Sequence, residues 1–174
     1  MKMDSHRKFI TRGLAALAGL AALIIALLAP ASGHAAEPGL PAASGLPTAK
    51  IITLTQTGCQ FIEPEAGDKK FKTKSGADCK AINAKSGENR LAASKPITLK
   101  PGKYIFRVTN KNVPYELGFY LRGSGLGRIL LPKVSGGGLI RGKTQDYAIT
   151  LKEGSYVYSC PLNPTPDYPL IVKK

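Results

Sequence analysis

The alternation of apolar and polar residues predicts a chain built mainly of β-strands. β-branched and aromatic side chains recur at every second position, for example at Tyr104, Phe106 and Val108, which is the period of a strand with one buried face. The segments with this character cover residues 50–57, 97–99, 104–110, 113–121, 144–151, 156–160 and 170–172. Short strands joined by Gly- and Pro-rich turns predict an all-β fold, an antiparallel Greek-key β-sandwich.

Three glycine-containing turns set the expected connections. Lys100-Pro101-Gly102-Lys103 predicts a hairpin that joins the strands over 97–99 and 104–110. The run Gly136-Gly137-Gly138 is interpreted as a flexible turn, and Lys152-Glu153-Gly154 as a tight turn into the strand that begins at Tyr156.

A long polar insertion follows the first predicted strand, over residues 58–94. It exceeds the length of ordinary loops, so it is expected to hold structure of its own, including a short helix over 76–85 that starts at Ser75 or Asp78. Its carboxylates suit either a hard cation, through oxygen ligands, or a solvated face neutralised by the lysines over 69–74. The solvated face is favoured. The carboxylates concerned are Glu63, Glu65, Asp68 and Asp78.

The beginning of the chain has the pattern of a secretory leader. Basic residues precede an apolar run over 14–31, and small residues follow up to Ala36. We therefore expect a signal peptide over residues 1–35, a flexible linker over 36–49 and one domain over 50–174. The alternative is an uncleaved membrane anchor, because the run is close to the shortest length that spans a bilayer. Either way the domain is expected outside the inner membrane, in the periplasm.

The exported part of the chain is strongly basic. Residues 1–35 hold four basic residues and one acidic residue, so the rest keeps 21 basic and 10 acidic residues, a net charge of +11. The basic residues are spread along the chain instead of forming one arm, and an exported chain is not expected to meet nucleic acid. The charge favours a protein partner with an acidic surface, or a membrane-associated one.

The three cysteines are expected to meet an oxidising compartment. Three cysteines allow three single pairings, and the sequence does not fix which one forms. Pairing Cys59 with Cys79 is favoured because it would staple the insertion, closing a loop of about 20 residues worth roughly 3 kcal/mol in the chain-entropy model. Cys160 would then remain free.

The residue types that the exported part lacks restrict its chemistry. The histidines are His6 and His34 and the methionines are Met1 and Met3, all within residues 1–35. No histidine is therefore left to act as a general base or to activate a nucleophile. We expect a protein without enzymatic activity.

The C-terminal segment nevertheless resembles the ligand loop of cupredoxins. An aromatic strand ends at Cys160, and Asn163 and Tyr168 follow at the spacing at which plastocyanin-like proteins place His and Met. The turn and strand over 99–110 and the approach to the loop over 151–160 are also similar to that family. The chain resembles the degenerate cupredoxin-like domains of exported metal-handling proteins, including those of periplasmic iron uptake.

The resemblance implies a copper site whose ligands have been replaced. The first histidine position falls around Tyr115 and Glu116, the second on Asn163 and the axial position on Tyr168. Type 1 copper needs two imidazoles and a thiolate, so this ligand set disfavours it. A remaining possibility is copper or iron held by Cys160 with Glu116, Asn163 and Tyr168. The alternative is a purely structural role, with Cys160 buried and Glu116 paired to Arg122 or Arg128.

The sequence thus predicts an exported, non-catalytic binding or accessory protein of metal or redox physiology. The first alternative is a metal-binding protein that uses Cys160 with oxygen ligands, and the second is a blue-copper electron carrier. An aromatic docking surface is also considered, made of the segment over 115–121 with Tyr156, Tyr158 and Tyr168. Core packing is the competing interpretation of these residues.

Overall fold

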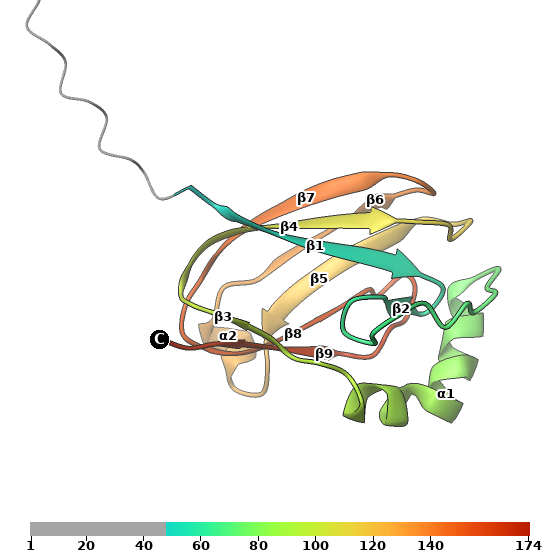
Figure 1. The fold of residues 1–174 in the computed structure, drawn as a ribbon, viewed down its shortest axis with the longest axis horizontal. Coiled ribbons are helices and arrows are strands. Elements are labelled where there is room, and N and C mark those ends of the chain that lie inside the picture. Colours follow the sequence, from blue (N-terminus) through green and yellow to red (C-terminus); the bar gives the residue numbers. More distant parts are fainter. Residues whose placement is uncertain (1–47) are drawn as a thin grey trace, which may run out of the picture. The chain divides into compact units, whose positions relative to one another are not determined.

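Two β-sheets face each other in the computed structural model, which describes residues 48–174 (Figure 1). The first sheet has the strand order β2-β1-β4-β7 and the second the order β3-β9-β8-β5-β6. The predicted all-β sandwich is confirmed. The strands are β1 Lys50–Thr57, β2 Gln60–Phe61, β3 Ile97–Leu99, β4 Gly102–Asn110, β5 Leu117–Gly123, β6 Val134–Leu139, β7 Thr144–Leu151, β8 Gly154–Ser159 and β9 Tyr168–Val172.

The core lies between the sheets and follows the period-two pattern. In β4, Phe106 and Val108 are fully buried, while Arg107 between them points outward and pairs with Asp146 of β7 at 2.8 Å. The ring of Phe119 stacks on that of Phe106, with centroids 5.6 Å apart. Alternation thus predicts the buried face of each long strand.

The hairpin predicted at Pro101-Gly102 does not form. β3 pairs in parallel with β9 in the second sheet, whereas β4 pairs in parallel with β1 and antiparallel with β7 in the first sheet. The Pro-Gly turn instead carries the chain from one sheet to the other, with Gly102 at φ +154°. The sandwich therefore contains two parallel pairs among its antiparallel ones.

The glycine run over 136–138 is also not a turn, because it lies inside β6. A Cβ on Gly136 would lie 2.9 Å from the Tyr147 ring, and a Cβ on Gly137 would lie 2.8 Å from Glu116 Oε1. On the neighbouring strand β5, a Cβ on Gly118 would lie 2.8 Å from the carbonyl oxygen of Gly136. The glycines permit this close packing at the edge of the second sheet.

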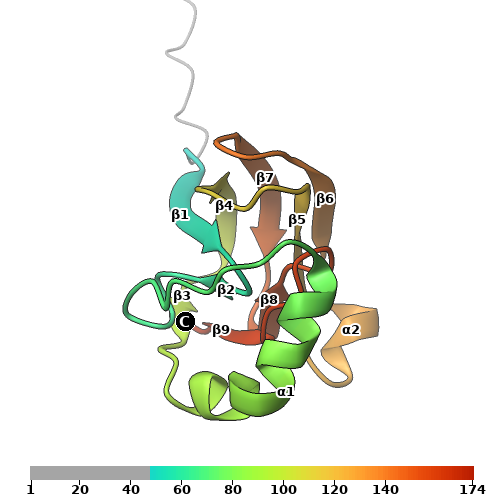
Figure 2. The same cartoon turned by 90° about the vertical axis from the view of Figure 1, so that its right-hand side faces the viewer.

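The insertion after β1 holds the predicted helix, but the helix is longer than expected. α1 spans Gly76–Ala92 with Ser75 as its N-cap, and Asp78 accepts hydrogen bonds from the backbone N–H groups of Lys74 and Ser75. These bonds lower the pKa of Asp78. The helix continues past Gly87, and Arg90 in its last turns is buried. Figure 2 shows α1 standing beside the second sheet.

A second short helix, α2 (Gly127–Leu130), connects β5 to β6. Neither α1 nor α2 is long and apolar enough to cross a membrane. The predicted signal peptide and most of the predicted linker lie outside the described residues. All the strands lie between Lys50 and Val172.

Candidate functional site

Cys160 lies directly after β8, at the end of the sandwich where α1 is attached. Its side chain is buried, and its Sγ accepts hydrogen bonds from the backbone N–H groups of Gly118 at 3.3 Å and Asn163 at 3.2 Å. Burial raises the pKa of the Cys160 thiol, and the backbone N–H groups oppose that rise without cancelling it. The group is therefore a protonated thiol at neutral pH.

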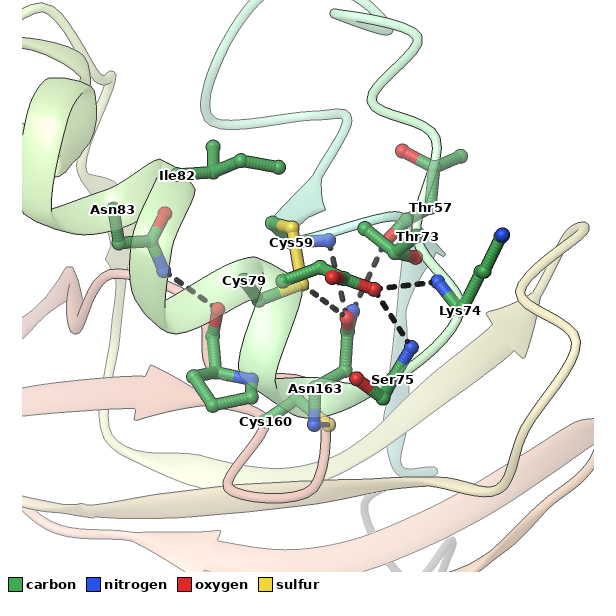
Figure 3. Close-up of a disulfide and its surroundings, with 12 residues drawn as sticks. Thr57, Cys59, Thr73, Lys74, Ser75, Cys79, Ile82, Asn83, Cys160 and Asn163 are labelled. Atoms are coloured by element: carbon green, nitrogen blue, oxygen red, sulfur yellow. Dashed lines mark hydrogen bonds between the residues drawn. A yellow bond between two sulfur atoms is a disulfide. The ribbon is translucent and has the colours of Figure 1, made fainter.

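Asn163 forms the centre of the hydrogen-bond network beside this thiol (Figure 3). Its Nδ2 donates to the carbonyl oxygen of Thr57 at 3.0 Å. Its Oδ1 accepts from the backbone N–H of Cys59 at 3.1 Å and from the Tyr115 hydroxyl at 2.9 Å. Asn163 has no exposed surface, so this side chain joins the Cys160 loop to the end of β1 and to the segment before β5.

The Cys59–Cys79 disulfide covers this network. The bond forms as predicted and leaves Cys160 as the free cysteine of the described residues. Cys79 Sγ lies 2.9 Å from Asn163 Oδ1 (Figure 3), a close contact because a disulfide sulfur has no proton to donate. Asn83 of α1 also donates to the carbonyl oxygen of Pro164 at 2.6 Å. The insertion is thus fastened over the C-terminal loop.

The structure brings only some of the predicted site residues together. Asn163 contacts Cys160, and Tyr115 joins them. Tyr168 is directed elsewhere, because its hydroxyl donates to Glu65 and its ring packs 5.5 Å from that of Tyr158, centroid to centroid. The exposed Glu116 accepts a hydrogen bond from the backbone N–H of Gly138 at 2.7 Å.

The ion pairs that the sequence offered for Glu116 are not present. Arg122 pairs with Asp167 at 2.7 Å and donates to Ser159 at 3.1 Å. Its guanidinium also lies over the Tyr120 ring, 4.7 Å from the centroid. Arg122 therefore reaches across the outer face of the second sheet, towards β8 and the segment before β9.

The aromatic docking surface considered from the sequence is wrong for most of its members. The side chains of Tyr156, Tyr158 and Tyr168 are all at most 1% exposed, and Phe119 is equally buried. These rings pack between the sheets because they lie on the inward-facing positions of their strands. These four rings are therefore not available to a partner.

The carboxylates of the insertion serve separate structural roles. Glu63 accepts from the backbone N–H of Thr55, and Asp68 from that of Lys70. Glu65 pairs with Arg90, and Asp78 caps α1. Over residues 48–174 no group of three or more His, Cys, Asp or Glu side chains is placed to hold a metal ion. The hard-cation alternative therefore gains no support.

The donor set around Cys160 does not fit type 1 copper. That centre requires two imidazoles and a thiolate, whereas the groups beside Cys160 are an amide and a phenol. The Asn163 amide oxygen already receives two hydrogen bonds, so a cation at this oxygen would have to break them. Cys160 and Asn163 are buried, hydrogen-bonded parts of the core.

Comparison with known proteins adds a likeness of fold. No family model matches the chain, and no curated protein sequence matches it. Among solved structures, amicyanin from Paracoccus versutus is similar at 16% sequence identity and a TM-score of 0.35, over 75% of this chain and 87% of amicyanin. A likeness at this level carries no ligand or activity over to this chain.

Two residues of this region were not singled out in the sequence. Arg90 binds Glu65, the carbonyl oxygen of Cys59 and Asn83, but in the sequence it is one of many basic residues. Gln56 donates from Nε2 to the carbonyl oxygen of Gly118 at 2.8 Å. Gln56 could have been found from the sequence, because it lies on the apolar face of the first strand and a buried amide needs hydrogen-bond partners.

The thiol environment predicts a specific pattern of reactivity. In the native protein at pH 8, Cys160 should react with Ellman's reagent much more slowly than an exposed cysteine, because it is buried and its raised pKa lowers the thiolate fraction. After unfolding in guanidinium without reductant, one thiol per chain should react. Three reactive thiols would show that the disulfide is absent, and rapid native reaction would show that Cys160 is accessible.

Proposed function

We propose that the chain is an exported, non-catalytic binding or accessory protein with a cupredoxin-like fold, which acts in metal or redox physiology without type 1 copper. The hydrogen-bonded cluster of Cys160, Asn163 and Tyr115 carries this proposal. It occupies the position that the sequence resemblance assigns to the copper ligands, and its polar groups are bonded to one another and to the backbone. The disulfide-tied insertion closes over it.

The closed site supports a binding role over electron transfer or catalysis. Electron transfer through a metal would need a ligand set that can hold the ion in two oxidation states, and a buried protonated thiol with one amide does not supply it. The basic charge of the exported part favours a partner with an acidic or membrane-associated surface. Export itself rests on the leader pattern over residues 1–35.

Copper and iron loading tests the proposal. The chain without residues 1–35 is incubated with one equivalent of Cu²⁺ or Fe³⁺, desalted, and examined by metal analysis and visible absorbance. We expect no intense thiolate-to-copper band and no retained ion, with the same result for Cys160→Ser. An intense band that Cys160→Ser removes would make the protein a copper carrier. A retained ion without that band, lost in Cys160→Ser, would instead establish the metal-binding alternative.

A further inference from the structure

α2 presents an apolar surface that the sandwich does not use. Leu126, Ile129 and Leu130 are 85%, 86% and 77% exposed, the three highest values among the exposed large apolar side chains of the described residues. Here these three residues are named the α2 tip. Leu131, by contrast, turns inward against the core. Large aliphatic side chains exposed together at one turn are unusual on a soluble surface and indicate a site of interaction.

The tip is held in place by the fold. The backbone N–H of Ser124 donates to the carbonyl oxygen of Ser155 at 2.9 Å, and the N–H of Leu131 to that of Gly127 at 2.9 Å. A Cβ on Gly123 would lie 2.1 Å from the carbonyl oxygen of Gly127, so a glycine is required where α2 folds back on β5. The exposure of the tip is thus fixed by backbone contacts on both sides of it.

Basic residues gather at the end of the sandwich that carries the tip. The pairing of Gly154 with Val172 brings the β7–β8 turn beside the C-terminal end of β9, and Leu131 packs where a Cβ on Gly154 would lie, 2.7 Å away. Figure 1 shows α2 and the end of β9 at this same end. The exposed basic residues of this end include Lys100, Arg128, Lys133, Lys152, Lys173 and Lys174, with Glu153 as an acidic neighbour.

We propose that the α2 tip inserts into the interfacial region of an anionic phospholipid membrane, with the surrounding lysines and arginines facing the headgroups. Aliphatic side chains on a protruding turn, flanked by basic residues, suit a lipid surface, where apolar insertion and attraction to anionic headgroups add together. A protein hot spot would favour Trp, Tyr and Arg in a packed pocket, and the tip has no aromatic residue.

The attachment of the chain is compatible with this orientation. β1 begins at this end, because Lys50 pairs with Tyr104 near the start of β4 and Gly102 pairs with Leu151 at the end of β7. The described chain therefore enters the sandwich at the end that carries the tip. The inference concerns the surface alone and goes beyond the proposed function, since it does not depend on what happens at Cys160.

Vesicle co-sedimentation tests the surface. The chain without residues 1–35 is used, because the apolar leader would bind vesicles by itself and both sheets, the core and the disulfide lie within residues 50–174. Vesicles of phosphatidylglycerol and phosphatidylcholine are compared with phosphatidylcholine alone. We expect binding to the anionic vesicles that is at least about tenfold stronger and that weakens in 0.5 M NaCl.

Two sets of variants distinguish binding through the α2 tip from non-specific binding through other exposed apolar residues. Leu126→Ser, Ile129→Ser and Leu130→Ser together should lower binding to the anionic vesicles by at least about tenfold. The matched control, Ile140→Ser with Leu162→Ser, changes two other exposed apolar residues, 60% and 47% exposed, and should bind as the parent does. Thermal unfolding should be similar for all three proteins, because the substituted side chains are exposed.

The proposal is overturned by any of four results. Equal binding of the tip variant and the parent, or no binding by the parent, would remove the membrane as the partner of the tip. Equal binding to neutral vesicles would remove the role of the basic residues. Sedimentation velocity that shows a dimer of the parent, lost in the tip variant, would assign the tip to a second copy of the chain. Metal loading at Cys160 is measured separately, so failure of one proposal leaves the other intact.

Discussion

Replacing Arg90 with methionine is expected to lower the free energy of unfolding by about 3–5 kcal/mol. Arg90 and Glu65 form a buried ion pair, with a distance of 2.6 Å between Nη2 and Oε1 and side chains that are 8% and 1% exposed. Methionine retains much of the length of the arginine side chain but leaves the carboxylate of Glu65 buried without its counter-charge. Guanidinium unfolding followed by circular dichroism measures the change.

The loss of unfolding free energy should exceed that of one ion pair, because Arg90 makes further contacts with the insertion. Its guanidinium donates to the carbonyl oxygen of Cys59 at 2.9 Å and lies over the Phe71 ring, 4.8 Å from its centroid. Glu65 in turn accepts a hydrogen bond from the Tyr168 hydroxyl of β9. The pKa of Tyr168 is raised, mainly by burial and also by the neighbouring Glu65 carboxylate. The network thus ties α1 and the insertion to the last strand.

Two control variants identify the cause of the loss. Arg107→Met breaks the exposed pair with Asp146 and should cost less than about 1 kcal/mol, because water screens that pair. Adding Glu65→Gln to Arg90→Met should restore much of the lost stability, since no charge then remains buried. If Arg90→Met costs no more than Arg107→Met, the buried pair is not a main support of the insertion.

The long strands could be predicted from the sequence because each has one buried face. β1 and β7 have the predicted bounds, and in β7 the exposed Asp146 faces away from the buried Tyr147 and Ile149, as alternation requires. Which strands pair with each other was harder to predict. A Pro-Gly turn indicates that the chain changes direction, but whether β3 and β4 join one sheet depends on β9, which follows β3 some 70 residues later.

The candidate site could be predicted only in part, because its contacts join distant segments. The position of Cys160 and its proximity to Asn163 follow from the loop spacing. Tyr115 comes to the same point from the segment before β5, whereas Tyr168 turns away because Glu65 of the insertion binds it. Nothing local to Tyr168 distinguishes a residue beside Cys160 from a core tyrosine, since the decisive partner lies 103 residues earlier in the chain.

Removing the Cys59–Cys79 disulfide is expected to cost roughly 3 kcal/mol of unfolding free energy. The bond closes a loop between residues 20 apart in sequence, and in the chain-entropy model a loop of this size is worth about that amount. The double variant Cys59→Ala and Cys79→Ala removes the bond. Its unfolding midpoint in guanidinium, compared with that of the parent without reductant, measures the loss.

The variant should also loosen the cover over the C-terminal loop. The N–H of Cys59 is bonded to Asn163, and Cys79 begins the part of α1 that lies against this loop, so freeing both ends weakens the enclosure of Cys160. We therefore expect the Cys160 thiol of the native variant to react faster with Ellman's reagent than that of the parent. Cys160→Ala is the matched control for the stability measurement. It removes a buried cysteine without opening a cross-link, so it should lower the free energy of unfolding by less than the double variant does. A double variant with unchanged stability and an unreactive Cys160 would show that the other contacts of α1 hold the insertion in place without the bond.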